Sequence, residues 1–236
     1  MGTSQSAVAL LSSGLDSSVA LAMAIADGYE VVLALTFDYG QKAATREILH
    51  AGWLCDYFKI PHRTLKVPFL AEAKKSGLLK GDSSSTLPAP NLKELDNPDF
   101  LKKSSEAVWV PNRNGVFIEI ASCLAEQLSA NHVIVGFNRE EAMTFPDNSD
   151  SYREAINHAL SFSTANRVKV ISPTSPLNKI EIVKVARTLQ FPLDLIWSCY
   201  DDVSKMCGKC ESCMRLKRAL NQNKVNLDAY FTDPHL

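Results

Sequence analysis

The sequence has no run of about 18 consecutive apolar residues, which is the length that a helix needs to cross a bilayer. Its first residues, MGTSQSAVALL, also lack the basic region and the long apolar region of a secretory signal. We therefore expect a protein that makes no contact with a membrane and works in the cytoplasm.

An excess of charge of one sign is missing as well. The 25 lysines and arginines are balanced by 26 aspartates and glutamates, which leaves a formal net charge of -1 at pH 7. Proteins that hold nucleic acid use basic charge to neutralise its phosphates, so the composition predicts no direct nucleic-acid partner. The 236 residues, 46% of them hydrophobic, are enough to bury a full core, and a small-molecule substrate is the favoured ligand.

Cysteine is scarce outside one segment, and no histidines are spaced as a metal-binding pair. Four of the six cysteines form C-x2-C-x2-C with one further cysteine eight positions upstream: Cys199, Cys207, Cys210 and Cys213. This clustering indicates a metal site rather than disulfides, and four thiolates favour one structural Zn²⁺. An iron–sulfur cluster is the competing interpretation, although the further cysteine and the proline of ferredoxin-type motifs are absent. Four buried free thiols are the plainer alternative.

Short apolar runs alternate with segments of helical periodicity along most of the chain. Continuous apolar runs are typical of strands that are covered on both faces, and repeated strand-then-helix order is typical of a parallel sheet wrapped by helices. The sequence therefore predicts an α/β fold with a doubly wound parallel sheet, which binds ligands at the carboxyl ends of its strands. The expected strands are 7–11, 30–37, 63–67, 133–136 and 168–171, and the expected helices are 17–26, 43–58, 115–128 and 152–162.

Residues 77–108 interrupt this alternation with prolines, serines and scattered charge. A structureless stretch of that length inside a domain is usually either functional or disordered. We expect a mobile flap near the ligand site, with a disordered insertion as the alternative. Further along, Asn178 and Glu181 fit a capping box that opens a helix ending near Leu189.

The segment LSSGLDSS, residues 11–18, follows the first expected strand and opens the first expected helix. Free backbone N–H groups, serine hydroxyls and Gly14 gather there, and such donors can hold a pyrophosphate. The segment matches neither G-x-x-x-x-G-K-S/T nor G-x-G-x-x-G, so an ordinary serine-capped turn is the competing interpretation. We expect Asp16 to cap the helix, with a contact to Mg²⁺ as the second interpretation.

LSSGLDSS is similar to the S-G-G-x-D-S loop of the PP-loop ATP pyrophosphatases, and further segments resemble one family of that group in the same order. They are FDYGQK (37–42), VPNRN (110–114), GFNREEAMTFPDNS (136–149), SPLNKIEIV (175–183) and CYDDVSKMCGKCESC (199–213). On these motifs the chain resembles the QueC (ExsB) family. The resemblance implies a fold like that of the adenine nucleotide alpha hydrolases (HUP), an ATP-binding domain over 1–190 with the flap 77–108, and a helical zinc-binding region over 191–236.

The activity that this resemblance implies is an ATP-dependent carbon–nitrogen ligation that converts 7-carboxy-7-deazaguanine and ammonia into the nitrile preQ0, in queuosine and archaeosine biosynthesis. A carboxylate has only oxide or hydroxide to expel, so ammonia cannot displace it without activation. One ATP would turn the acid into an acyl-adenylate and a second would activate the resulting amide, with AMP as the leaving group each time. The resemblance also implies ATP with Mg²⁺, one Zn²⁺ per chain and a homodimer.

The family motifs assign candidate residues to each part of this reaction. ATP would be held by Leu10, Leu11, Ser12, Ser13, Gly14, Leu15, Asp16, Ser17, Ser18, Val19 and Ala20. Arg113 and Lys179 are the candidate catalytic cations, which would neutralise the pyrophosphate or the α-phosphate. The deazaguanine would be bound by Tyr39, Gln41, Phe137, Glu140, Glu141, Phe145 and Asp147, with Asp147 the first choice for its N1–H and amine.

Three positions depart from the family pattern. Ser13 stands where the family usually has glycine, Ala43 where a histidine is usual, and FPDNS where many members read YPDCR. If residue 13 requires a positive φ, serine there is strained by about 1 kcal/mol or more. Other activities therefore stay open: transfer of the activated deazaguanine to another amine, for example on a protein, PP-loop modification of tRNA, and a binding module with a decayed ATP loop.

Overall fold

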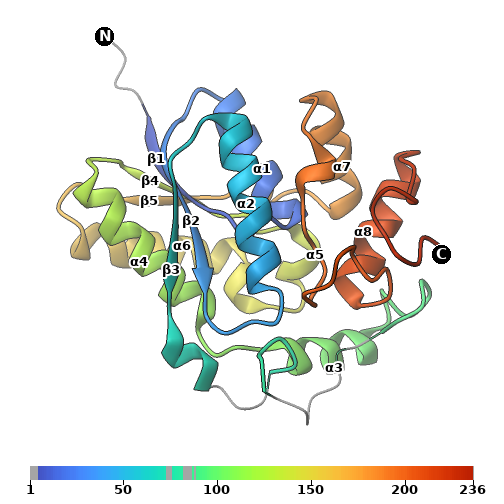
Figure 1. Cartoon of the computed structure of the whole chain (residues 1–236). Coiled ribbons are helices and arrows are strands. Elements are labelled where there is room, and N and C mark those ends of the chain that lie inside the picture. Colours follow the sequence, from blue (N-terminus) through green and yellow to red (C-terminus); the bar gives the residue numbers. More distant parts are fainter. Residues whose placement is uncertain (1–4, 73–75, 82–86, 88, 236) are drawn as a thin grey trace.

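A five-stranded parallel sheet forms the centre of the computed structural model, which describes residues 5–72, 76–81, 87 and 89–235 (Figure 1). Its order is β3-β2-β1-β4-β5, and each neighbouring pair is parallel. The doubly wound parallel sheet expected from the sequence is confirmed, with all five strands found within two residues of their expected bounds. They are β1 (Ser6–Leu10), β2 (Glu30–Asp38), β3 (His62–Lys66), β4 (His132–Ile134) and β5 (Lys169–Ile171).

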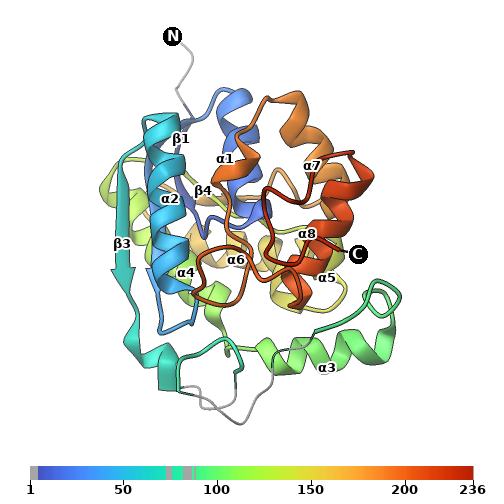
Figure 2. The ribbon, with the colours of Figure 1, turned by 45° about the vertical axis from the view of Figure 1, so that its right-hand side comes forward.

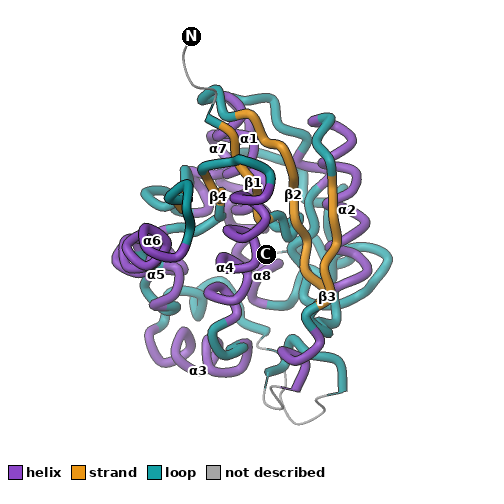
Figure 3. The backbone as a smooth tube through the Cα atoms, turned by 90° about the vertical axis from the view of Figure 1, so that its left-hand side faces the viewer, coloured by secondary structure: helices purple, strands orange, loops and turns teal. Residues whose placement is uncertain are grey.

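Helices cover both faces of the sheet. Since side chains alternate along a strand, Ala7 and Ala9 of β1 enter one apolar core and Val8 enters the other. The first core is packed by α1 (Leu15–Ala26), α2 (Ala44–Phe58), α7 (Lys179–Thr188) and α8 (Glu211–Gln222), and the second by α4 (Arg113–Gln127) and α6 (Asp150–Ser163). Figure 3 shows α2 beside β2 and β3 on one side of the molecule and α6 on the other. The short elements are α5 (Arg139–Ala142) and the 3₁₀ turns Pro68–Glu72, Pro146–Asn148 and Leu193–Leu195.

Regular structure also occurs within 77–108, where the sequence predicted none. Helix α3 (Pro98–Val108) begins at Asn97, whose side-chain oxygen accepts hydrogen bonds from the backbone N–H groups of Asp99 and Phe100. An asparagine cap followed by proline at the first helical position is a strong helix start. The expectation of a structureless stretch was therefore wrong for residues 98–108, which lie along one end of the molecule (Figures 1 and 2). Residues 82–86 and 88 lie outside the described part of the chain.

The predicted capping box at the start of α7 is confirmed. The Asn178 side chain accepts from the backbone of Glu181, and the Glu181 carboxylate accepts from the backbone of Asn178 at 2.8 Å. After α7 the chain returns to the core, since Phe191, Trp197 and Phe231 pack in the same apolar cluster as α1. Within the described residues, no helix has both the length and the apolar character required to cross a bilayer.

Candidate active site

A cavity of about 290 Å³ opens at the carboxyl ends of β1, β2 and β4. The strands that follow β1 in the chain lie on both of its sides, so this edge is the switch point where such sheets bind ligands. The wall of the cavity combines the turn after β1, the segment after β2, the start of α4 and the segment after β4. One end of the fold therefore brings together motifs that lie far apart in the sequence.

The turn after β1 forms an open helix start. Gly14 is the N-cap of α1 and no side chain caps it, and the first bond within the helix runs from the Ser18 N–H to the Gly14 carbonyl at 3.1 Å. The N–H groups before Ser18 have no partner inside the helix. The hydroxyls of Ser12 and Ser17 lie 3.1 Å apart beside them. The turn thus presents backbone and hydroxyl donors to the cavity, as an anion site requires.

A glycine just after β4, the strand beside β1, allows this geometry. A Cβ atom on Gly136 would lie 2.4 Å from the backbone nitrogen of Ser17. The chain after β4 therefore rests directly against the first turn of α1, and a residue with a side chain does not fit without movement of the backbone.

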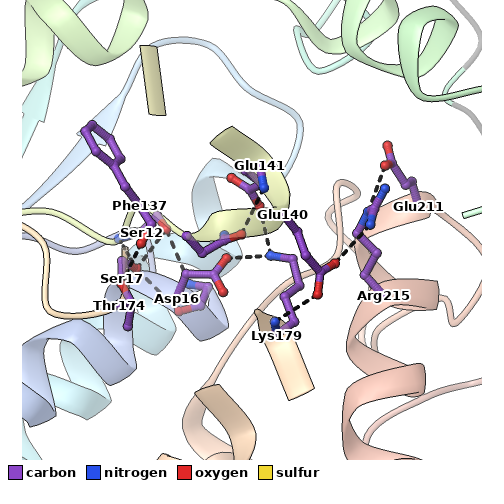
Figure 4. Close-up of polar contacts among 12 residues, drawn as sticks. Ser12, Asp16, Ser17, Phe137, Glu140, Glu141, Thr174, Lys179, Glu211 and Arg215 are labelled. Carbon is purple, nitrogen blue, oxygen red and sulfur yellow. Dashed lines mark hydrogen bonds and ion pairs between the residues drawn. The ribbon is translucent and has the colours of Figure 1, made fainter. Parts of the chain in front are cut away.

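Asp16 does not cap α1, which contradicts the expectation from the sequence. Its Oδ2 instead accepts from the Nζ of Lys179 at 2.5 Å, and the same Nζ donates to Glu141 Oε1 at 2.8 Å (Figure 4). Lys179 is only 7% exposed. The Oδ1 atom of Asp16 is buried and has no hydrogen-bond partner among the described residues.

The charges of this ion-pair group determine its pKa values. Burial raises the pKa of Asp16 to about 6, against the attraction of Lys179. Burial acts in the same direction on Glu141, but Lys179, Arg215 and Asn138 together outweigh it and lower the pKa of that carboxyl. Burial also opposes the charge of Lys179, yet the two carboxylates together raise its pKa. Lys179 therefore carries a permanent positive charge beside the turn after β1.

Glu140 links this group to α8, because its Oε1 accepts from the backbone N–H of Lys179 at 2.9 Å. Its Oε2 accepts from Arg215 and from Arg218, each at 3.1 Å, and it lines a smaller cavity of about 40 Å³ rather than the main one. Figure 4 shows Glu140 between Lys179 and Arg215. The structure thus separates Glu140 from the six other residues predicted to bind substrate, all of which line the main cavity.

Arg113 lines the cavity at the start of α4. Its Nη1 donates to the hydroxyl of Tyr39 at 3.4 Å, and its guanidinium carbon lies 5.9 Å from the centre of that ring. Burial opposes its charge, but contact with Tyr39 and the nearby Asp147 raises its pKa. Burial also raises the pKa of Asp147, which lines the cavity with Phe145. Trp109, which the sequence did not indicate, is parallel to Phe145 with the ring centres 6.3 Å apart.

Glu47 is a second cavity residue that sequence reasoning missed. Its Oε2 accepts from the Nε2 of Gln41 at 2.7 Å, and burial raises its pKa to about 7. Gln41 is itself held by the Phe37 carbonyl at 2.9 Å and the Tyr39 N–H at 3.0 Å. The spacing of six residues between Gln41 and Glu47, just after a strand at the ligand edge, is the signal that could have identified it.

The remaining predicted ATP residues divide into two groups. Those on the cavity wall are Leu10, Leu11, Ser12, Gly14, Leu15, Asp16 and Ser17. Ser13, Ser18, Val19 and Ala20 are buried behind it. Ser13 has a φ of 60°, the positive value under which a serine is strained.

The four cysteines meet beside the same cavity. Cys199 follows the 3₁₀ turn after α7, Cys207 and Cys210 precede α8, and Cys213 lies in its first turn. Their sulfur atoms all lie within 4.8 Å of one another, and the backbone N–H groups of Lys209 and Cys210 both donate to the sulfur of Cys207 at 3.4 Å. Such N–H···S contacts stabilise thiolates. The cluster is suited to a metal ion, and Cys199 also lines the main cavity.

Known proteins resemble this chain along nearly its whole length. A family model described as "Queuosine biosynthesis protein QueC" matches residues 6–224. A 7-cyano-7-deazaguanine synthase of Desulforamulus reducens is 50% identical over 224 residues, which are 95% of this chain and 97% of that protein. A 7-cyano-7-deazaguanine synthase of Bdellovibrio bacteriovorus is 42% identical over 233 residues, 99% of this chain and 100% of that protein.

Among solved structures, more distant similarities are found. The U34-tRNA thiolase NcsA from Methanococcus maripaludis, solved with its 4Fe-4S cluster, has a TM-score of 0.49 at 17% identity, covering 94% of this chain and 68% of that chain. The NMN synthetase from Francisella tularensis has a TM-score of 0.48 at 15% identity, covering 94% of this chain and 78% of that chain.

Proposed function

The chain belongs to the QueC family of queuosine biosynthesis proteins, and from that premise we propose that it synthesises 7-cyano-7-deazaguanine from 7-carboxy-7-deazaguanine, ammonia and two ATP. The observation that carries the proposal is the single cavity shared by the open turn after β1, the cations Arg113 and Lys179, and the acidic and aromatic side chains after β4. An enzyme that joins an acid to AMP must place phosphate-binding donors, cations and substrate-binding side chains around one cavity.

The turn after β1 would hold the polyphosphate of ATP. The free N–H groups at the start of α1 and the hydroxyls of Ser12 and Ser17 point donors at one place, and the helix dipole adds positive potential. The unpartnered carboxylate oxygen of Asp16 suits Mg²⁺, which binds oxygen ligands and, when bound, neutralises charge on the phosphates. Lys179 orients Asp16 through its 2.5 Å contact and adds positive charge to the site.

Arg113 would stabilise the charge that develops when the acid attacks the α-phosphate. It carries a fixed charge, and its contact with Tyr39 holds it on the wall of the same cavity as the turn. Preorganised cations of this kind contribute mainly by electrostatic stabilisation of the transition state. The deazaguanine would stack against Phe145 or Phe137, and Asp147 would accept its N1–H and exocyclic amine.

The cysteine cluster would hold one structural Zn²⁺. Four sulfur ligands within 4.8 Å of one another fit the tetrahedral arrangement of such a site, which leaves no open position for chemistry. We also expect a homodimer in the cytoplasm, as the family resemblance implies, and the mass of the native protein or a sedimentation measurement tests the dimer.

The test of this function is incubation of the purified protein with 7-carboxy-7-deazaguanine, ATP, Mg²⁺ and ammonium, followed by mass spectrometry. We expect the nitrile and two AMP for each nitrile formed. The variant Arg113→Met is expected to lose at least about 100-fold in rate, in the range typical for a removed charge-stabilising group. Arg63→Met, on the exposed side of the edge strand β3, is the matched control and should retain activity.

Two results would contradict the proposal. Absence of both AMP and nitrile with the wild-type protein would exclude this reaction. AMP with a different adduct would indicate transfer of the activated deazaguanine to another amine, an alternative that the altered FPDNS segment at residues 145–149 leaves open.

A further inference from the structure

The proposed reaction has a chemical requirement that the cations of the site do not meet. When ammonia attacks the acyl-adenylate, a C–N bond forms, the C–O bond to AMP breaks with its electron pair, and one N–H proton must leave to give the amide. When the amide oxygen is adenylated, one of the two remaining N–H protons leaves, and when the C–O bond to AMP then breaks with its electron pair, the last N–H proton leaves to give the nitrile. A group inside the cavity must accept these protons.

Four carboxylates line the cavity, and their contacts distinguish them. Asp16 and Glu141 both bind the ammonium of Lys179, so protonation of either would break an ion pair. Asp147 is the residue proposed above to bind the N1–H and the exocyclic amine of the deazaguanine. Glu47 forms no ion pair within the part of the chain that the structure describes, and its hydrogen-bond partner is the neutral amide of Gln41.

Glu47 lines the cavity, with one carboxylate oxygen held by Gln41 and the other without a hydrogen bond among the described residues. Gln41 donates to Oε2 at 2.7 Å and is locked by two backbone contacts, so the carboxylate has a fixed orientation. Three titratable or charged groups interact with it: Asp38 at the end of β2, Tyr39 just after it, and Arg113 of α4. Burial raises the pKa of Glu47 to about 7, with Gln41 and Arg113 acting in the opposite direction. A base with a pKa near the working pH transfers protons most effectively.

We propose that Glu47 is a catalytic base, whose free carboxylate oxygen takes the N–H protons from the ammonia-derived nitrogen in both halves of the reaction. Each proton then passes to solvent, which restores the carboxylate. This inference rests on the proposed function, and it assigns a role to a residue that neither the adenylation nor the recognition of the base uses.

The test separates adenylation from the steps at nitrogen. With acid, ATP and Mg²⁺ but without ammonium, one turnover releases a burst of pyrophosphate, and this step needs no base at nitrogen. Glu47→Gln keeps the size of the side chain, and we expect its burst to stay within about twofold of wild type. Upon addition of ammonium, its rates of amide and nitrile formation should fall by about 10²–10³-fold, the usual contribution of general-base catalysis.

Two further variants serve as a rescue test and as a matched control. Glu47→Asp retains a carboxylate and should recover part of the lost nitrile rate, whereas Glu154→Gln, on the exposed side of α6, should match wild type. A Glu47→Gln enzyme that makes nitrile at the wild-type rate, or that loses the burst together with the nitrile, overturns this inference while the proposed function stands. A wild-type protein with neither burst nor nitrile overturns both.

Discussion

Ser13 is a strained residue at the centre of the turn after β1. Its φ of 60° lies in the left-handed region, which costs a non-glycine residue about 1–2 kcal/mol. Its hydroxyl is buried and has no hydrogen-bond partner within the described ranges. The strain anticipated from the sequence, on the condition of a positive φ, is therefore present.

Ser13→Gly removes both costs and should stabilise the protein. We expect the free energy of unfolding in urea to rise by about 1 kcal/mol, less than the sum of the two costs, because glycine also gains freedom in the unfolded chain. The pyrophosphate burst should be unchanged. A loss of the burst would instead indicate that the Ser13 hydroxyl contacts the nucleotide.

Glu47 makes stability depend on pH in a defined direction. Its folded pKa of about 7 lies above its ordinary value of 4.5, so the folded state binds the proton more tightly than the unfolded state. Its contribution is therefore complete below pH 4.5 and is lost as the pH rises through about 7. Glu47→Gln should be more stable than wild type at pH 8 by up to about 3 kcal/mol, since one pKa unit corresponds to about 1.4 kcal/mol.

Urea titrations of the wild type and of Glu47→Gln at pH 5 and pH 8 measure this difference. It should fall to about 1 kcal/mol or less at pH 5, where Glu47 is protonated in the folded wild type but largely ionised in the unfolded chain. A stability difference of the same size at both values would contradict the assigned pKa.

At the scale of elements, α8 connects the cysteine cluster to α3. Glu211 at its start accepts from Ser104 of α3 and from Arg215. One turn further along, Arg218 donates to Asp96, just before α3, at 2.7 Å. Because Cys210 caps α8 and Cys213 lies in its first turn, a metal ion bound there would fix the helix that holds α3.

Loss of the metal should therefore loosen two helices together. In Cys213→Ser, or after chelation, we expect amide hydrogen exchange to accelerate at 211–222 and at 98–108, with the β1–β2 pairing less affected. Cys123→Ser, at an exposed cysteine outside the cluster, is the matched control. Faster exchange in α8 with unchanged exchange in α3 would show that α3 is held by other contacts.

The sequence predicted those elements whose signals are local. Apolar runs located the strands, and the capping box located the start of α7, because each depends on neighbouring residues. The role of Asp16 could not be read in this way, since its partner Lys179 is 163 residues away and reaches it only after the sheet forms. For the same reason Glu140 and Glu141, adjacent in sequence, gave no sign that one faces α8 and the other the main cavity.

At the scale of the whole molecule, one apolar core extends from β1 to the last described residues. Its buried members run from Ala7 to Phe231 and include Ile196, Trp197 and Leu216. The proposed division into 1–190 and 191–236 therefore separates two parts of the sequence that share their packing. This predicts a single cooperative unfolding transition, in which tryptophan fluorescence and far-ultraviolet circular dichroism coincide.

A fragment of residues 1–190 should accordingly show no cooperative urea transition. It lacks the side chains that cover α1 and α7, and the lost burial at about 25 cal/mol per Å² exceeds the small net stability of a domain. The full chain under identical conditions is the control. A sharp transition in the fragment would instead establish 1–190 as an independently folding unit.

The position of these last contributors to the core has a consequence during synthesis. The ribosome produces residues 1–190 before residues 191–231, which shield α1 and α7, and at about 5–20 residues per second this segment takes several seconds to translate. During those seconds the nascent chain exposes the apolar surface that the later segment covers. Molecular chaperones that bind such faces on emerging polypeptides are thus expected to engage this protein late in translation.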